Sequence, residues 1–257
     1  MMFVVFFLTN MKLSINLNKI ALLRNSRGGN NPDIEHYARI ALEENILGLT
    51  VHPRPDSRHV TYQDLIKIQF LTNEYNKEFN IEGNPLENKS ENYKGFMSLI
   101  KEFNPTQATL VPDATNQLTS DHGWEISNLN NADYIHTLKK DCTRCSVFIN
   151  AGTDINELEN NSIDAIEIYT GPYAQAVKSN DVQLIERELK QIIFTSETAK
   201  KRNMRINAGH DLDIGNLPLL LELDLIDEVS IGHAIISESL NQGFKNTIQQ
   251  YIDLIYG

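Results

Sequence analysis

The residues best suited to chemistry are histidines and arginines gathered in one short stretch. Residues 50–59 read Thr-Val-His-Pro-Arg-Pro-Asp-Ser-Arg-His and continue the apolar run that begins at Leu47. Imidazole accepts or donates a proton near neutral pH, and one guanidinium group can bind two oxygens of a phosphate at once. The two prolines stiffen the segment, and few of its side chains are apolar enough to pack in a hydrophobic core. The stretch therefore indicates the wall of a pocket for an anionic ligand, with a solvated connection as the alternative.

Two Gly-His pairs mark a second region of interest. They lie in Asn207-Ala208-Gly209-His210 and Ser230-Ile231-Gly232-His233, and the second leads directly into a predicted helix. Glycine lets a ligand approach the backbone, and free N–H groups at a helix start bind anions. A third segment, 24–29, carries Arg27, which joins Arg54 as a candidate phosphate anchor. These clusters predict two phosphorylated substrates or one bisphosphate, the alternative being a solvated basic loop.

Two glutamates stand in otherwise apolar runs. Glu82 ends the run 79–82, and Glu167 lies inside 165–169. Burial favours the neutral form of a carboxyl group and makes its ionised form a stronger base. We therefore predict that both take part in proton transfer. The alternatives are an ion pair of Glu82 with Arg54 or Lys19, and a core carboxylate satisfied by its neighbours for Glu167.

Short apolar runs alternate with longer helical patterns along the chain. The runs predict strands at 13–16, 47–51, 79–82, 108–111, 146–149, 165–169, 204–207 and 228–231. Helical spacing predicts helices near 32–44, 61–71, 91–103, 132–140, 155–159, 181–202, 216–222, 234–240 and 245–255. A polar loop is expected up to Asn31, and another around Gly171 and Pro172.

Eight strand-then-helix units predict a single (β/α)8 barrel, the TIM barrel, with a closed parallel sheet over residues 11–257. Each unit has roughly the length of a βαβ repeat, and no linker rich in proline, glycine or serine divides them. An open doubly wound sheet is the alternative. It would favour G-x-G-x-x-G after the first strand for dinucleotide binding, and that motif is missing there.

A barrel brings the carboxyl ends of all its strands to one mouth. Four of the seven histidines, His52, His59, His210 and His233, then meet there beside Glu82. A lone histidine at a strand end is usually a structural hydrogen-bond partner, whereas four around a carboxylate predict acid–base chemistry. Strands two to eight end without a lysine, which argues against an imine formed on the enzyme.

Composition excludes several classes of partner. The net charge of -11 argues against nucleic acid, which attracts basic surfaces. The apolar run from Phe3 to Leu8 is far shorter than a bilayer span, so no membrane partner is expected. We predict that residues 1–10 are dispensable or a misassigned start, with Met11 as a second plausible start.

The cysteines are few. Cys142 and Cys145 cannot form a disulfide framework, which favours a reducing cytoplasm. Their C-x-x-C spacing lacks a second pair for zinc and precedes the predicted strand 146–149, unlike a redox pair. We therefore assign them no function.

Six segments together resemble one family. They are I-N-L-N-K-I-A-L-L-R-N-S-R-G (15–28), T-V-H-P-R-P-D-S-R-H (50–59), F-N-I-E-G (79–83), I-E-I-Y-T-G (166–171), N-A-G-H (207–210) and I-G-H-A-I-I (231–236). In this order and spacing the chain resembles the pyridoxine 5'-phosphate synthase family over nearly its whole length after residue 11. The resemblance implies a (β/α)8 barrel that condenses 1-deoxy-D-xylulose 5-phosphate with 3-amino-2-oxopropyl phosphate. The products would be pyridoxine 5'-phosphate, inorganic phosphate and water, formed through a substrate-derived imine without cofactor or metal in a homo-octamer.

The resemblance also implies residue roles. His52 and Glu82 would be proton acceptors, His210 a proton donor, and Glu167 would lie near the transition state. The aminoketone phosphate would be held by Asn16, Arg27, Asp211, Gly232 and His233. The deoxyxylulose phosphate would be held by Asn18, Lys19, Arg54, His59 and Thr119.

The chain departs from the family pattern in two places. Many members have Asp-His where this chain has Asn18-Lys19, and glycine where it has Asp211. An inward carboxylate beside a phosphate is unfavourable, so we expect only the backbone N–H of Asp211 to contribute. Two other functions stay open: a metal-dependent phosphosugar lyase or epimerase with His52, Glu82 and His210 as ligands, and a non-catalytic phosphosugar-binding barrel.

Overall fold

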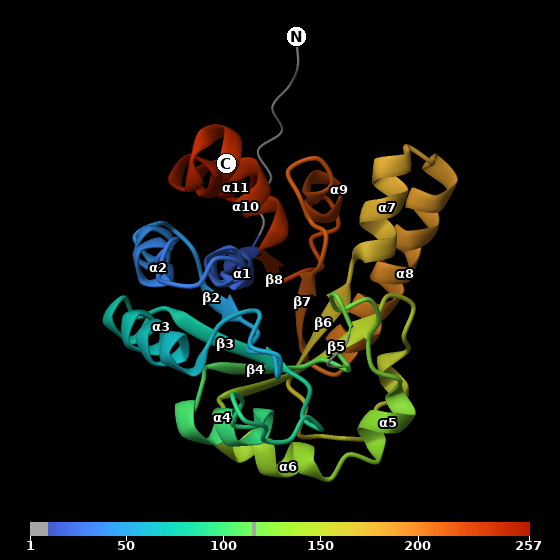
Figure 1. The fold of residues 1–257 in the computed structure, drawn as a ribbon. Helices are drawn as coiled ribbons and strands as arrows, with labels where there is room; N and C mark the ends of the chain where they lie inside the picture. The colour runs from blue at the N-terminus through green and yellow to red at the C-terminus, as the bar shows by residue number, and fades with distance from the viewer. Residues whose placement is uncertain (1–9, 115–116) are drawn as a thin grey trace.

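The structure is a computed structural model that describes residues 10–114 and 117–257 (Figure 1). Within these residues eight parallel strands pair in chain order, and β8 closes on β1. The strands are β1 Lys12–Asn16, β2 Gly48–Val51, β3 Glu78–Gly83, β4 Gln107–Leu110, β5 Arg144–Asn150, β6 Ala165–Tyr169, β7 Arg205–Gly209 and β8 Glu228–Ile231. The predicted (β/α)8 barrel is therefore confirmed. Of the segment predicted to be dispensable, residues 1–9 lie outside the described part.

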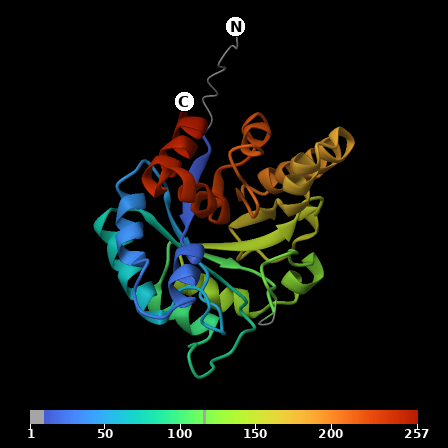
Figure 2. The same ribbon diagram turned by 45° about the horizontal axis from the view of Figure 1, so that its top comes forward.

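Helices surround the closed sheet (Figures 1 and 2). They are α1 Asn18–Asn25, α2 Ile34–Leu42, α3 Tyr62–Glu74, α4 Phe96–Phe103, α5 Ile126–Asn130, α6 Tyr134–Leu138, α7 Gly171–Ser179, α8 Val182–Lys201, α9 Leu217–Leu221, α10 His233–Gln242 and α11 Phe244–Tyr256. Short 3-10 turns occupy Lys139–Asp141 and Ile155–Glu157. Among the described residues no helix is long and apolar enough to cross a membrane.

Two segments predicted as loops directly after strands are helices, and α5 is a third helix, in the long polar loop expected between strand 108–111 and the helix near 132–140. The expected loop before Asn31 contains α1, because Ile20 and Ala21 are buried on one face of that segment. The expected loop around Gly171 and Pro172 is α7, where proline takes an early helical position that lacks an N–H partner in any case. Both helices begin at the carboxyl ends of strands, so they bring further side chains to the mouth.

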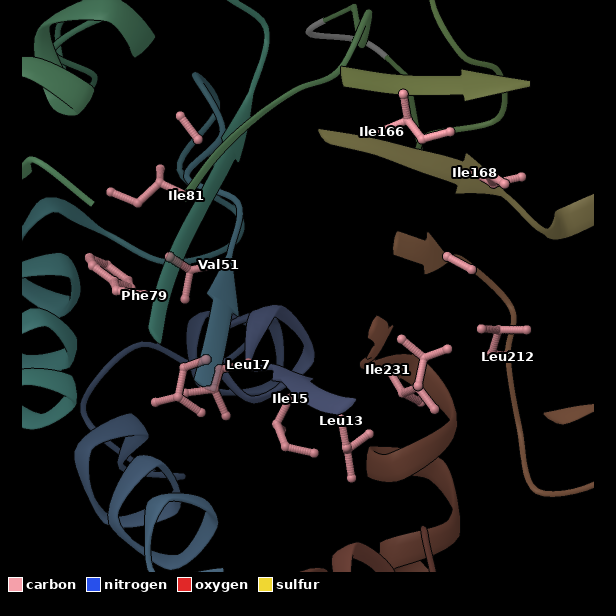
Figure 3. Close-up of a cluster of buried hydrophobic side chains, with 14 of the residues drawn as sticks. Leu13, Ile15, Leu17, Val51, Phe79, Ile81, Ile166, Ile168, Leu212 and Ile231 are labelled. Carbon is pink, nitrogen blue, oxygen red and sulfur yellow. The ribbon is translucent and has the colours of Figure 1, made fainter. Parts of the chain in front are cut away.

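Apolar and polar side chains alternate along the strands, so the two faces of the sheet differ. Leu13, Ile15, Ile166 and Ile168 belong to the apolar cluster of Figure 3, which packs between the strands and the helices. The intervening positions carry polar side chains, a pattern that a strand's two-residue period sends to the opposite face. The Nδ2 of Asn207 on β7 lies 3.4 Å from Oε1 of Gln107 on β4, a hydrogen bond that spans the barrel interior.

The interior is therefore polar, whereas barrels of this class are usually filled by branched apolar residues. Hydrogen bonds connect Ser14 to Thr50 and Asn80 to both Thr50 and Thr109. The sequence predicted buried strands but not the polar lining of the interior. Each strand was predicted from its apolar residues, and these face the surrounding helices.

The cysteines lie at the start of β5. The strand begins at Arg144, so Cys145 belongs to it, and the expectation that both cysteines precede the strand is wrong for that residue. Both thiols are free, and burial raises the pKa of Cys142 to about 11. A raised pKa keeps a thiol protonated and unreactive.

Candidate active site

A cavity of about 890 Å³ opens at the carboxyl ends of the strands. Its size suits a small organic ligand or a pair of them. Thirteen of the fourteen predicted site residues line it: Asn16, Asn18, Lys19, His52, Arg54, His59, Glu82, Thr119, Glu167, His210, Asp211, Gly232 and His233. Arg27 is the exception. It is exposed beside Gly28 and Gly29, both of which have positive φ, and it does not line the cavity.

His52 and Glu82 form a pair at the base of the cavity. Nδ1 of His52 lies 3.9 Å from Oε2 of Glu82, and both side chains are buried. That separation is too long for a hydrogen bond, so each group is available to a substrate. Arg54 pairs with Asp113, and within the described residues neither Arg54 nor Lys19 forms an ion pair with Glu82.

Two asparagines, one at the end of β1 and one at the start of α1, position this pair. Asn16 donates from Nδ2 to Oε2 of Glu82 over 3.5 Å, while its Oδ1 accepts the backbone N–H of Asn18 at 2.9 Å. Oδ1 of Asn18 accepts the backbone N–H of His52 at 2.7 Å. An aspartate at position 18 would accept that bond equally well. The departure from the family's aspartate therefore preserves the geometry of His52.

Burial and neighbouring charge shift both members of the pair toward neutrality. Burial, then the carboxylates of Glu167 and Asp113, raise the pKa of Glu82 well above its usual range. Burial, then the charge of Arg54, lower the pKa of His52 well below its usual range. A neutral imidazole is a competent base, and an ionised Glu82 is a stronger base than an ordinary glutamate.

Glu167 on β6 lies beside Asn207 on the neighbouring strand β7. Asn207 in turn lies beside Glu228 on β8. Burial and the charge of Glu228 raise the pKa of Glu167 to about 8. Its Oε2 is buried without a hydrogen-bond partner among the described residues. The alternative of a carboxylate satisfied by its neighbours is therefore not met at that oxygen.

The Glu167→Gln variant should unfold at a higher temperature than the wild type at pH 8.5, with no difference near pH 4.5. The folded protein retains a proton between the ordinary pKa of 4.5 and about 8, where the unfolded chain has released it, so wild-type stability falls as pH rises through that window. Glutamine removes this penalty, which is on the order of a few kcal/mol. Thermal unfolding across pH measures it. Exposed Glu186→Gln is the control, and a pH-independent difference would contradict the assignment.

The loop after β2 carries the most buried cation of the mouth. Arg54 pairs with Asp113 and donates to the carbonyl of Gln117 at 3.1 Å. Asp113 also accepts a hydrogen bond from Ser120 at 2.8 Å. His59 is buried nearby, and burial followed by the charge of Arg54 lowers its pKa to about 4. A neutral His59 can donate one hydrogen bond to a phosphate while Arg54 supplies charge.

His210 follows β7 and contacts the segment after β4. Its Nε2 lies 2.9 Å from Oγ1 of Thr119, and its ring meets that of Tyr169 edge-on at 5.3 Å. Oδ2 of Asp211 lies 3.1 Å from Nδ1 of His210, close but outside hydrogen-bond alignment. The Asp211 side chain is half exposed, and its backbone has φ 57°, a region that favours the glycine of other family members.

After β8, the backbone at Gly232 passes close to Asn16 at the end of β1. A Cβ on Gly232 would stand 2.9 Å from Cβ of Asn16, so the glycine is required where α10 begins. His233 is the first residue of α10 and is exposed at the mouth. Lys19 lies at the start of α1, a helix that contacts α10, and burial followed by the charges of Arg58 and Arg54 lowers the pKa of Lys19.

Sequence reasoning missed several lining residues. Asp113, which follows β4 and pairs with Arg54, received no role from the sequence and lies beside the cavity rather than in its lining. Tyr169, Gln175 and Lys178 also line the cavity, the last two from α7, the helix that was predicted as a loop. Among the described residues no group of three or more histidine, cysteine, aspartate or glutamate side chains is placed to hold a metal ion.

The closed barrel and its mouth of imidazoles, buried carboxyls and cations define a (β/α)8-barrel enzyme of acid–base type. A family model described as "Pyridoxal phosphate biosynthesis protein PdxJ" matches residues 13–257. The chain therefore belongs to this family.

Relatives of the same name agree with this chain over nearly the full length. Pyridoxine 5'-phosphate synthase of Xanthomonas axonopodis pv. citri is 42% identical over 248 residues, which cover 95% of this chain and 96% of the relative. The enzyme of the same name from Cytophaga hutchinsonii is 42% identical over 245 residues, covering 94% and 97%. The predicted family resemblance is thus confirmed.

Solved structures share the fold at low identity. Thiamine phosphate pyrophosphorylase from Pyrococcus furiosus has a TM-score of 0.57 at 10% identity, covering 96% of both chains. A tryptophan synthase structure from M. tuberculosis has a TM-score of 0.58 at 10% identity, covering 96% of this chain and 92% of that one. These likenesses support the barrel architecture alone.

Proposed function

We propose that this barrel condenses 1-deoxy-D-xylulose 5-phosphate with 3-amino-2-oxopropyl phosphate to form pyridoxine 5'-phosphate, inorganic phosphate and water. The observation that carries the proposal is the buried His52–Glu82 pair, 3.9 Å apart and not hydrogen-bonded to each other, at the base of a cavity large enough for two small substrates. Family membership over residues 13–257 supplies the reaction.

The protein's part in this chemistry is to move protons. The amine of one substrate attacks the ketone of the other, so the imine needs no lysine of the enzyme. His52, neutral because it is buried, accepts a proton, and Glu82 accepts another once a cationic intermediate lowers its pKa. His210 donates a proton to a leaving group, and Glu167 lies near the developing charge. Dehydration, loss of phosphate and ring closure complete the sequence.

The two phosphates are assigned to adjoining sides of the mouth, which meet at Asn16 and Asn18. Lys19, Arg54 and His59, with Asn18 and Thr119, form the side proposed for deoxyxylulose phosphate. The side proposed for the aminoketone phosphate consists of Asn16, Asp211, Gly232 and His233. Arg27 completes that side only if its exposed loop folds over the bound substrate.

The decisive test supplies both substrates to the purified protein and follows product absorbance. We expect turnover that is unchanged by a chelator, because the proposed steps are proton transfers. Tight binding of both substrates without product would favour the phosphosugar-binding barrel. Activity lost with chelator and restored by a divalent metal would favour the metal-dependent lyase or epimerase.

We also propose, from the family resemblance, that the protein works in the cytoplasm as a homo-octamer. Light scattering on the purified chain tests the assembly. A mass other than eight chains would overturn that part without touching the proposed reaction.

A further inference from the structure

Asn25, the last residue of α1, binds three consecutive backbone carbonyls of the loop after β2. Its Nδ2 lies 3.2 Å from the carbonyl oxygen of Ser57, 3.1 Å from that of Arg58 and 2.7 Å from that of His59. One amide group thus gathers the backbone of the segment that ends in a proposed phosphate ligand. Neither the acid–base chemistry nor the phosphate contacts described above use Asn25.

The orientation of the amide is determined by its neighbour. Nε of Arg24 donates to Oδ1 of Asn25 at 3.0 Å. Because a guanidinium group only donates, the oxygen of Asn25 must face it and the NH2 group must face the loop. Arg24 itself is fixed, since its two terminal nitrogens bind the two oxygens of Asp64 at 2.6 and 2.7 Å in a buried pair.

Asp64 ties this chain of contacts to the far end of the same loop. It forms the capping box of α3, accepting the backbone N–H of Thr61 at 2.7 Å and its hydroxyl at 2.8 Å. The loop is therefore held at Thr61 by Asp64 and at residues 57–59 by Asn25. Both attachments lead back to Arg24, so the three side chains act as one support.

The loop needs such a support because its backbone is strained. Ser57 has φ 57°, a left-handed conformation that costs a non-glycine residue free energy. Three carbonyls that converge on one point also repel one another unless a donor lies between them. His52, in contrast, is held by Asn18 on the other side of Pro53. Different side chains at the two ends of α1 therefore hold the proposed proton acceptor and the proposed phosphate loop.

We infer that Asn25 is a positioning residue that holds residues 57–59 in the shape needed to bind the phosphate of the deoxyxylulose substrate. The inference rests on the proposed function, which assigns Arg54 and His59 to that substrate. Loss of Asn25 should weaken binding of one substrate, because the loop carries none of the residues proposed to bind the aminoketone phosphate.

The test compares Asn25→Asp and Asn25→Ala with the wild type in steady-state kinetics, varying each substrate in turn. Aspartate keeps the shape of the side chain and removes its donors, and alanine removes the group without adding charge. Asn131→Asp is the matched control, since Asn131 also donates to a backbone carbonyl, at 2.8 Å, but lies at the end of α5.

For both Asn25 variants we expect KM for deoxyxylulose phosphate to rise about tenfold or more, as the loss of a cooperating set of hydrogen bonds implies. KM for the aminoketone phosphate and kcat should stay within about threefold, and Asn131→Asp should match the wild type. An unchanged KM for deoxyxylulose phosphate would overturn the inference. So would an equal rise in both KM values with a fall in kcat, which indicates general loss of structure.

Failure of the proposed function looks different, because the wild type itself would then make no product. Calorimetric titration with deoxyxylulose phosphate alone decides the inference in that case. Weaker binding to both Asn25 variants than to the wild type and Asn131→Asp supports the positioning role. Equal affinity of the variants and the wild type, or no binding to any of them, overturns it.

Discussion

Replacing Glu82 by glutamine should lower kcat about a thousandfold, while the protein stays folded. General acid–base groups contribute about 10²–10⁴-fold to rate, and Glu82 is the buried carboxyl beside His52 at the base of the cavity. Glutamine keeps the size of the side chain and the contact with Asn16, but it cannot accept a proton. Single-turnover rates with both substrates measure the loss of the chemical step directly.

Stability provides the control for this variant. Burial and nearby carboxylates already disfavour the charged form of Glu82, so a neutral glutamine should not lower the unfolding temperature. His52→Asn should cause a loss of similar size, and the double variant should be little worse than either, because the two groups serve the same proton transfers. If both single variants kept near-normal single-turnover rates, the proposed roles would be wrong.

Replacing Arg54 by alanine should cost about 3–5 kcal/mol in the free energy of unfolding and raise KM for deoxyxylulose phosphate strongly. Arg54 and Asp113 have side-chain exposures of only 3% and 4%, so removal of the cation leaves a buried carboxylate without its partner. The same change removes the guanidinium group proposed to bind the phosphate. Urea unfolding and steady-state kinetics measure the two effects separately.

A double variant separates stability from binding. Arg54→Ala with Asp113→Asn removes the orphaned charge, so most of the lost stability should return. KM for deoxyxylulose phosphate should stay high, because the cation is still missing. A double variant that recovered both properties would show that Arg54 supports the fold without binding substrate.

Much of the fold could be predicted because the barrel repeats a local pattern. Each strand is a short apolar run and is read directly, and eight such runs at even spacing leave few other topologies. The helices α1 and α7 were missed because each follows a strand at once and begins with residues typical of loops, Asn18 in one and Gly171-Pro172 in the other. Their apolar faces become buried only once the barrel exists.

The site could be predicted as a set of residues but not as a set of partners. The histidines and Glu82 could be identified from their positions at the ends of predicted strands, because a barrel brings all such ends to one mouth. Nothing in the sequence paired Arg54 with Asp113, 59 residues away, or placed Asn25 beneath residues 57–59. Hydrogen bonds between residues so far apart in the chain depend on how the loops pack, and loop packing cannot be predicted from the local sequence.

The sequence by itself determined the barrel, the family and the side-chain types that gather at the mouth, because these follow from periodicity and from motifs read in order. Only the tertiary structure decided which groups are neutral, which are paired and which stand free. Glu82, Glu167 and His52 have shifted pKa values because burial removes water and brings other charges near them. Burial and charge act through distances in space, and folding creates those distances.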